Sequence, residues 1–333
     1  MLYLTFLRAH TNELPKFGKN SVLNGFIACS QSLAACGVAM SSGTHFSCYW
    51  FLEKSSGFNL LLRKLFSYAI VFHDFIFSKF ARMAEKKKIL VMVASPKNER
   101  SGTLIPTKAF VEGLEQNGDY ETEYIFIDKM HIKPCRGCLS CWGREDVSCF
   151  MKDDDVPMIR EKLINSDIVI WSFPLFLFSL PGQMKVLMDR IVGMVHPYMG
   201  QKLEEGANAL NSHLHGLQFQ KEGQKIILLS SCAWMDLDVV YEPIRKQFDI
   251  ILGHEGYTLI ACPQMRALDH RGGPRRLNML REKYRKGGAE LATTGKLSQE
   301  AIDLMQKPIF SEDAYVTLVT EFVTHMFDRD DNF

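Results

Sequence analysis

The sequence predicts an α/β fold built on a doubly wound parallel sheet, with an N-terminal extension that has no clear pattern and a helical C-terminal extension. Two observations predict this fold. Short apolar runs alternate with segments of helical periodicity five times between residues 88 and 263. The apolar runs are continuous rather than alternating, which is typical of strands buried on both faces of a parallel sheet.

The expected elements follow from these runs and from the residues that end them. The expected strands are residues 89–94, 120–127, 168–171, 225–230 and 257–261. The expected helices are residues 103–116, 153–165, 181–192, 238–252, 298–306 and 312–327. Asn117-Gly118 is a helix C-terminal signal, and the acidic residues Asp153, Asp154 and Asp155 favour the start of a helix more than a metal site.

Three parts are expected along the chain: residues 1–82, 83–263 and 264–333. Residues 1–57 show no sustained period of 2 or 3.6. From Met83 the chain has a short charged run and then an apolar strand, a common beginning of an α/β domain. We therefore hold two interpretations of residues 1–82 open. They are either a disordered or wrongly translated leader, with Met83 as the true start, or a divergent extension that packs.

Composition excludes several classes of protein. The chain has 333 residues, of which 47% are hydrophobic, and a net charge of +1, which argues against a nucleic-acid or membrane-surface binder. Nine cysteines are too few for a disulfide scaffold, and the sequence shows no secretory signal, so we expect a cytoplasmic protein. The most apolar stretch, residues 58–80, is interrupted by charged residues, so no membrane span is expected.

The loop after the first strand has the composition of a phosphate-binding loop. Its sequence is Ala94-Ser-Pro-Lys-Asn-Glu-Arg-Ser-Gly-Thr103. Such a loop lies at the carboxyl edge of the sheet, where the first N–H groups of the next helix are unpaired and serve a phosphate. It matches neither the dinucleotide fingerprint nor the Walker loop. An ordinary helix cap stays open as the alternative.

The loop after the third strand is apolar and aromatic. Its sequence is Ser172-Phe-Pro-Leu-Phe-Leu-Phe-Ser-Leu-Pro-Gly-Gln-Met-Lys185. Its prolines end the strand, and its phenylalanines suit the face of a flat aromatic ligand. The alternative is an apolar loop buried under the C-terminal residues or against another subunit.

Together these two loops resemble the phosphate loop and the ring-binding loop of NADPH-dependent FMN reductases. The resemblance covers roughly residues 88–263 and implies a five-stranded flavodoxin-like sheet of order 2-1-3-4-5, non-covalent FMN and NAD(P)H as co-substrate. The residues that it implies for FMN are Ser95, Lys97, Ser101, Gly102, Thr103, Pro174, Leu175, Phe176, Leu177, Phe178, Ser231 and Cys232. Lys97 stands where arginine is common, and Phe176 where tyrosine is common.

A third motif, rich in cysteine, follows the second strand. Cys135, Cys138, Cys141 and Cys149 are spaced so that four thiolates can surround one compact centre. The spacing resembles that of iron–sulfur flavoproteins, in which a [4Fe-4S] cluster relays electrons to FMN. Zinc also accepts four thiolates, and thiols without metal are the third alternative.

The predicted function is therefore hydride transfer from NAD(P)H through FMN to a quinone, a flavin or another small acceptor, in a homodimer or homotetramer. The alternative is an iron–sulfur flavoprotein or a flavodoxin-type carrier that exchanges electrons with a ferredoxin-like partner. No catalytic side chain is predicted, because the cofactor performs the hydride chemistry.

Overall fold

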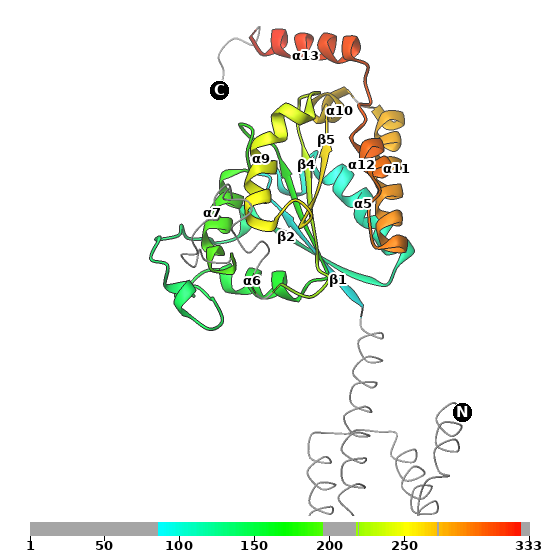
Figure 1. Ribbon diagram of the computed structural model, residues 1–333. Helices are drawn as coiled ribbons and strands as arrows, with labels where there is room; N and C mark the ends of the chain where they lie inside the picture. The colour runs from blue at the N-terminus through cyan, green and yellow to red at the C-terminus, as the bar shows by residue number, and fades with distance from the viewer. Residues whose placement is uncertain (1–85, 196–217, 219, 272, 328–333) are drawn as a thin grey trace, which may run out of the picture. The chain divides into compact units, whose positions relative to one another are not determined.

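The computed structural model describes residues 86–195, 218, 220–271 and 273–327. The two interpretations of residues 1–82 lie outside these ranges. The centre is a five-stranded sheet in the order β2-β1-β3-β4-β5, in which all neighbouring strands are parallel (Figure 1). The strands are β1 Lys87–Val93, β2 Tyr120–Phe126, β3 Ile168–Pro174, β4 Lys225–Ser231 and β5 Thr258–Cys262. The predicted fold class and strand order are confirmed.

Helices cover both faces of the sheet, as the alternation of strands and helices predicts. They are α5 Leu104–Asn117, α6 Val156–Asn165, α7 Gly182–Arg190, α9 Leu237–Leu252, α10 Met265–Arg271, α11 Gly273–Thr294, α12 Gln299–Gln306 and α13 Glu312–Phe327. Side chains of α6, α7 and α9 belong to the core on one face, and side chains of α5, α10, α11 and α12 belong to the core on the other.

Strand β1 shows how the sequence divides between the two cores. Leu90 and Met92 face the core under α6, α7 and α9, whereas Val91 and Val93 face the core under α5. Each side chain is 1% exposed or less. Because successive residues of a strand point to opposite faces, a continuous apolar run is required when both faces are covered.

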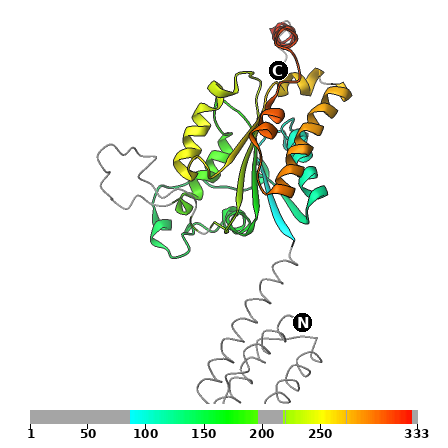
Figure 2. The same cartoon turned by 45° about the vertical axis from the view of Figure 1, so that its right-hand side comes forward.

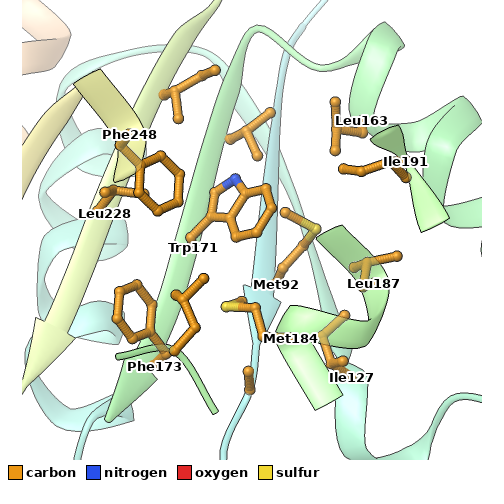
Figure 3. Close-up of a cluster of buried hydrophobic side chains, with 14 of the residues drawn as sticks. Met92, Ile127, Leu163, Trp171, Phe173, Met184, Leu187, Ile191, Leu228 and Phe248 are labelled. Carbon is orange, nitrogen blue, oxygen red and sulfur yellow. The ribbon is translucent and has the colours of Figure 1, made fainter. Parts of the chain in front are cut away.

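An aromatic pair lies at the centre of the first core (Figure 3). The ring of Trp171 on β3 meets the ring of Phe248 on α9 edge to face, with centroids 5.9 Å apart and planes at 82°. Met92 lies on the other side of the indole. This geometry is favourable beyond its buried area, and it fixes α9 against the middle of the sheet.

Helix α11, the longest helix of the C-terminal extension, packs unusually closely against α5. A Cβ added at Gly288 would overlap the carbonyl oxygen of Phe110, and one added at Gly113 would overlap the carbonyl oxygen of Arg285. An ion pair between Arg285 and Glu112 at 2.9 Å crosses the same interface. Both views place α5, α11 and α12 side by side (Figure 2). The C-terminal extension is therefore part of the second core.

The sequence showed only a basic stretch at residues 266–286, where the structure has α10 and most of α11. The pair Gly287-Gly288 lowers intrinsic helix propensity. Gly288 lies against the backbone of α5 and Gly287 against the side chain of Met305 on α12, so tertiary packing outweighs propensity. Among the described residues, no helix is both long and apolar enough to cross a membrane.

Replacing Gly288 by alanine tests this packing. In an exposed helix, alanine is more favourable than glycine by about 1 kcal/mol. Here the added Cβ overlaps backbone of α5, so we expect Gly288→Ala to lower the free energy of unfolding by about 1–3 kcal/mol. Urea unfolding measures the effect. Gly182→Ala, whose Cβ meets open space, is the matched control. A Gly288→Ala protein as stable as the parent would contradict the packing.

Candidate functional site

Three loops leave neighbouring strands and meet at the carboxyl edge of the sheet. Backbone pairing continues into them, because Ala94 donates its N–H to Ser172 O (2.9 Å) and Leu175 donates to Ser231 O (2.8 Å). The strand order reverses between β1 and β3. In open α/β sheets such a reversal opens the crevice in which ligands bind. The predicted FMN residues of all three loops are thus brought to one edge.

The loop after β1 folds into a compact turn with buried hydroxyls. Asn98 donates its N–H to Ser95 O (2.8 Å), and Ser101 donates its N–H to Asn98 O (3.0 Å). Asn98 has a φ of 47°, which asparagine tolerates better than most residues. The side chains of Ser95, Ser101 and Thr103 are buried, whereas Lys97 is exposed.

Several polar groups of this turn have no partner within the described ranges. Ser95 and Ser101 are buried residues whose hydroxyls make no hydrogen bond there, and the N–H groups of Gly102 and Thr103 find no acceptor there. The fully buried side-chain atom of this turn that has no partner is Asn98 Oδ1, an acceptor. The set of donors at the start of α5 therefore fits a ligand rich in acceptor atoms, such as a phosphate.

A network of hydroxyls joins this turn to the sheet. Thr103 Oγ1 and Ser231 Oγ are 2.6 Å apart, and Thr107 Oγ1 and Ser172 Oγ are 2.8 Å apart. Thr107 also donates to the carbonyl oxygen of Thr103 (2.8 Å). The first turn of α5 is thus tied to both β3 and β4. Thr107 is absent from the sequence prediction because its role depends on contacts with distant strands.

The aromatic loop after β3 contains a tight two-residue turn. Phe176 and Ser179 exchange backbone hydrogen bonds of 3.0 and 2.9 Å. Between them Leu177 and Phe178 have φ angles of 46° and 59°. Such turns prefer asparagine and glycine. We call Phe176–Ser179 the aromatic turn. Its apolar side chains are exposed, with Leu177 at 91%.

The loop after β4 contains Cys232, a predicted FMN residue whose side chain is buried. The thiol of Cys232 is buried and donates to the carbonyl oxygen of Trp234 (3.4 Å). Burial raises the pKa of Cys232 to about 11, so the thiol stays protonated at neutral pH. The backbone of Cys232 is paired as well, because its N–H donates to Cys262 O (3.0 Å) and its carbonyl oxygen accepts from the N–H of Met265 (2.9 Å). Sequence reasoning missed Trp234, whose ring is 53% exposed.

The four cysteines of the third motif line one pocket. The pocket has a volume of about 310 Å³ and is lined by Cys135, Cys138, Cys141, Cys149, Arg190 and seven further residues, which belong to the same loop, to α7 and to the chain just after α7. All four thiols are free. No three His, Cys, Asp or Glu side chains in the described part of the chain are close enough to hold a metal ion. Four free thiolates are the right kind of ligand for a zinc or iron–sulfur centre. In this structure, however, the thiols are farther apart than a bound metal requires.

Two of these thiols have shifted pKa values. The Ser140 hydroxyl donates to Cys138 Sγ (3.3 Å) and lowers the pKa of the exposed Cys138 thiol. Burial raises the pKa of Cys141, and the neighbouring thiols Cys149 and Cys135 add to that effect.

Contacts with the chain after α7 hold the cysteine loop in place. Trp142 donates its indole N–H to the carbonyl oxygens of Val192 (3.2 Å) and Val195 (3.1 Å). Cys141 lies directly against Gly193, where an added Cβ would overlap Val147 O and Cys141 Cβ. The loop therefore requires a glycine at this position.

A buried ion pair closes the loop at its other end. Arg190 and Asp154 are in contact with both side chains fully buried, and Arg190 also donates to the carbonyl oxygens of Lys133 (2.8 Å) and Met151 (3.2 Å). Burial opposes ionisation of Asp154. Hydrogen bonds from Arg190 and from the N–H groups of Lys133 and Val156 outweigh it and hold the pKa of Asp154 below its usual range.

Replacing Asp154 tests this ion pair. Asp154→Asn leaves the Arg190 charge buried without a counter-charge, so we expect a loss of about 3–5 kcal/mol in the free energy of unfolding. Asp153→Asn is the control, because Asp153 pairs with Lys133 at the exposed surface, where a pair contributes at most about 1 kcal/mol.

The lowered pKa of Asp154 also gives a pH dependence. Its contribution to stability is present above the unfolded pKa of about 3.9 and is lost as the pH falls through the lower folded value. We expect acid unfolding of Asp154→Asn to lack this component. Equal acid dependence in both proteins would show that the pair does not stabilise the loop.

Comparison with known families matches the fold. A family model described as the flavodoxin-like fold matches residues 87–228. This stretch contains the phosphate-type loop after β1, the cysteine loop and the aromatic turn.

The sequence is also similar to archaeal proteins named iron-sulfur flavoprotein. The protein of Methanosarcina thermophila is 32% identical over 99 residues, covering 30% of this chain and 50% of that protein. A protein of Methanocaldococcus jannaschii is 32% identical over 103 residues, covering 31% and 51%. The chain thus spans about half the length of these relatives. They carry the name of the group that the cysteine spacing resembles.

Solved structures are similar at lower sequence identity. An NAD(P)H:quinone oxidoreductase from Methanothermobacter marburgensis is 19% identical, with a TM-score of 0.45, covering 62% of this chain and 98% of that one. An FMN-dependent NADH-azoreductase from Bacillus anthracis is 17% identical, with a TM-score of 0.44, covering 62% and 100%.

Proposed function

We propose, on the premise that residues 87–228 are a flavodoxin-like domain, that this chain is an FMN-dependent oxidoreductase. It transfers hydride from NAD(P)H through FMN to a quinone, a flavin or another small acceptor. The nicotinamide donor rests on the resemblance of the two ligand loops to those of FMN reductases. The flavin rests in addition on the chemistry of the sheet edge.

The observation that carries the proposal is the set of unpaired donors in the loop after β1. The hydroxyls of Ser95 and Ser101 and the N–H groups of Gly102 and Thr103 surround the start of α5. They suit the oxygens of the FMN phosphate, and Lys97 adds a positive charge. Dipoles of the α5 backbone favour an anion at the same place.

The other two loops supply the ring site in this proposal. In this proposal Pro174, Leu175 and the aromatic turn border the edge on one side, and Ser231 and Cys232 border it on the other. Apolar side chains exclude water from the ring face. When bound, FMN supplies the hydride chemistry, so the chain has to position it rather than provide an acid or base.

The proposal also covers the oligomeric state of the chain and the compartment in which it works. The side chains of Val316 and Val323 on α13 are exposed and offer apolar surface to another subunit. We propose that the chain forms a homodimer or homotetramer, and such apolar surface would support a contact between subunits. Free thiols such as Cys138 are typical of the reducing cytoplasm.

A second candidate is an iron–sulfur flavoprotein, which the cysteine pocket favours. Cys135, Cys138, Cys141 and Cys149 would hold a [4Fe-4S] cluster, which adds one-electron exchange with a ferredoxin-like partner. The shared pocket and the Arg190 anchor support this candidate. Binding requires the loop to draw its thiols closer together.

Removing the two buried hydroxyls tests the flavin site. We expect the double variant Ser95→Ala, Ser101→Ala to bind FMN about 100-fold more weakly, because each hydrogen bond to a charged group contributes about 1.5–3 kcal/mol. Quenching of flavin fluorescence measures the affinity. Thr317→Ala, at an exposed position on α13, is the control. FMN affinity equal in the double variant and the parent would count against the phosphate site.

Anaerobic purification tests the cluster. If the second candidate is right, the protein contains iron and acid-labile sulfide in equal amounts, and Cys149→Ser loses both. Cys262→Ala, which removes a buried thiol of the opposite core, keeps them. Protein with full activity and no iron would dismiss the cluster.

A further inference from the structure

We propose that helix α13 of one copy of this chain docks by its outward face into an open groove between α11 and α12 of a second copy. The inference rests on the homo-oligomer in the proposed function and deepens it, because it names the two surfaces that meet. The groove shares no lining residue with the cysteine pocket and none with the proposed flavin site.

The groove lies on the C-terminal extension and is positively charged. It has a volume of about 640 Å³, and the lining residues that the argument uses are Arg275, Met279, Glu282, Lys283 and Lys286 of α11 and Leu304 of α12. Those of α11 follow the spacing of one helix face. Glu282, the one carboxylate among the described lining residues, already pairs with Arg285 (2.7 Å) and lies 4.0 Å from Lys286. Cations are therefore in excess there.

Apolar surface lies open between these cations. Met279, in the middle of the α11 face, is 49% exposed, and Leu304 is 42% exposed. Burial lowers the pKa of Lys283, and the nearby Lys307 adds to that effect, so a carboxylate in the groove would favour the charged form of Lys283. The groove therefore suits an occupant that presents apolar and acidic side chains on one face, as an amphipathic helix does.

The outward face of α13 has this character. The exposed residues that share it by their spacing are Glu312, Asp313, Val316, Thr320 and Val323. The side chains of Val316 and Val323 are 56% and 41% exposed, and both carboxylates lie in the first turn. At a rise of 1.5 Å per residue, Glu312 to Val323 spans about 17 Å, the same length as Arg275 to Lys286 in the groove. The two surfaces match in length and are opposite in charge.

The outward face of α13 is not free to turn into the groove of its own chain. Its opposite face is anchored, because Tyr315 is buried in the second core and Arg266 of α10 lies over the ring of Phe322, 4.5 Å from its centre. Just before α13, the amide of Gln264 bonds both the N–H and the carbonyl oxygen of Phe310 (2.9 Å each). Figure 1 shows α13 next to α10 at the end of the domain.

An α13 face that fills the groove therefore comes from a second copy. A two-fold axis between the copies makes the exchange reciprocal, so that each helix enters the groove of its partner. Both exposed apolar surfaces of the extension are then covered by one kind of contact, which leaves neither open to solvent.

Charge reversal on the two surfaces tests the docking. The groove variant is Arg275→Glu, Lys286→Glu, and the helix variant is Glu312→Lys, Asp313→Lys. In either variant alone, like charges face each other, so we expect sedimentation velocity at low ionic strength to show a dimer dissociation constant raised about 100-fold. An equimolar mixture of the two is expected to restore the dimer, because each helix then meets a groove of opposite charge. A variant that had merely lost α13 would not be rescued.

Two further variants complete the test. Val316→Ser, Val323→Ser removes apolar surface at exposed positions without changing the charge, and we expect it to weaken the dimer about tenfold. Lys225→Glu, Lys246→Glu reverses two exposed charges on other elements. It is the matched control for the groove variant and leaves the dimer unchanged.

Three results would overturn the docking. Dimers of parent affinity in both charge variants would place the subunit contact on another surface and leave the proposed homo-oligomer standing. A mixture that stays monomeric would show that the two faces do not meet. A monomeric parent would overturn the docking and the proposed homo-oligomer together. Flavin fluorescence on the same samples reports FMN binding, so a failure of the proposed oxidoreductase is seen separately from a failure of the docking.

Discussion

The hydrogen bond between Thr103 and Ser231, at 2.6 Å, and its neighbour between Thr107 and Ser172, at 2.8 Å, hold the candidate site together. Both are buried, and a buried hydroxyl left without its partner costs about 1–3 kcal/mol. They fix the first turn of α5 against β3 and β4 at once. The donors of the phosphate-type loop, the aromatic turn and the loop of Trp234 all take their positions from these contacts.

Helix α7 links the two possible redox sites of the chain. It begins at Gly182, just after the aromatic turn, and ends at Arg190, whose guanidinium holds the cysteine loop through Lys133, Met151 and Asp154. A rigid helix of nine residues therefore connects the ring side of the sheet edge with the cysteine pocket. Any closure of the cysteine loop around a metal has to occur against this fixed point.

Most of the fold was predictable because local and tertiary preferences agree in it. The continuous apolar run of β1 is stable only as a strand that is covered on both faces. Ser298, a typical N-cap residue, caps α12 by accepting the N–H of Ala301. The strand order followed from the resemblance carried by two loops. The predicted FMN residues come to one edge because parallel strands end there together.

The missed features depend on contacts that a single sequence does not show. Gly287 and Gly288 lower helix propensity in the sequence alone, and only the contacts with Met305 of α12 and with the backbone of α5 explain them. Trp234 gave no pattern of its own, and the buried thiol of Cys232 could not be distinguished from an exposed one. The pairing of Arg190 with Asp154 joins residues 36 positions apart, so no local pattern reveals it.

The central claim is that the loop after β1 binds the phosphate of FMN. Calorimetric titration of the full chain with FMN and with riboflavin, which has the same ring but no phosphate, tests it most directly. The account predicts one FMN per chain, bound about 100-fold more tightly than riboflavin, because charge-assisted hydrogen bonds are lost without the phosphate. Equal affinity for the two flavins, or no binding of either, would contradict it.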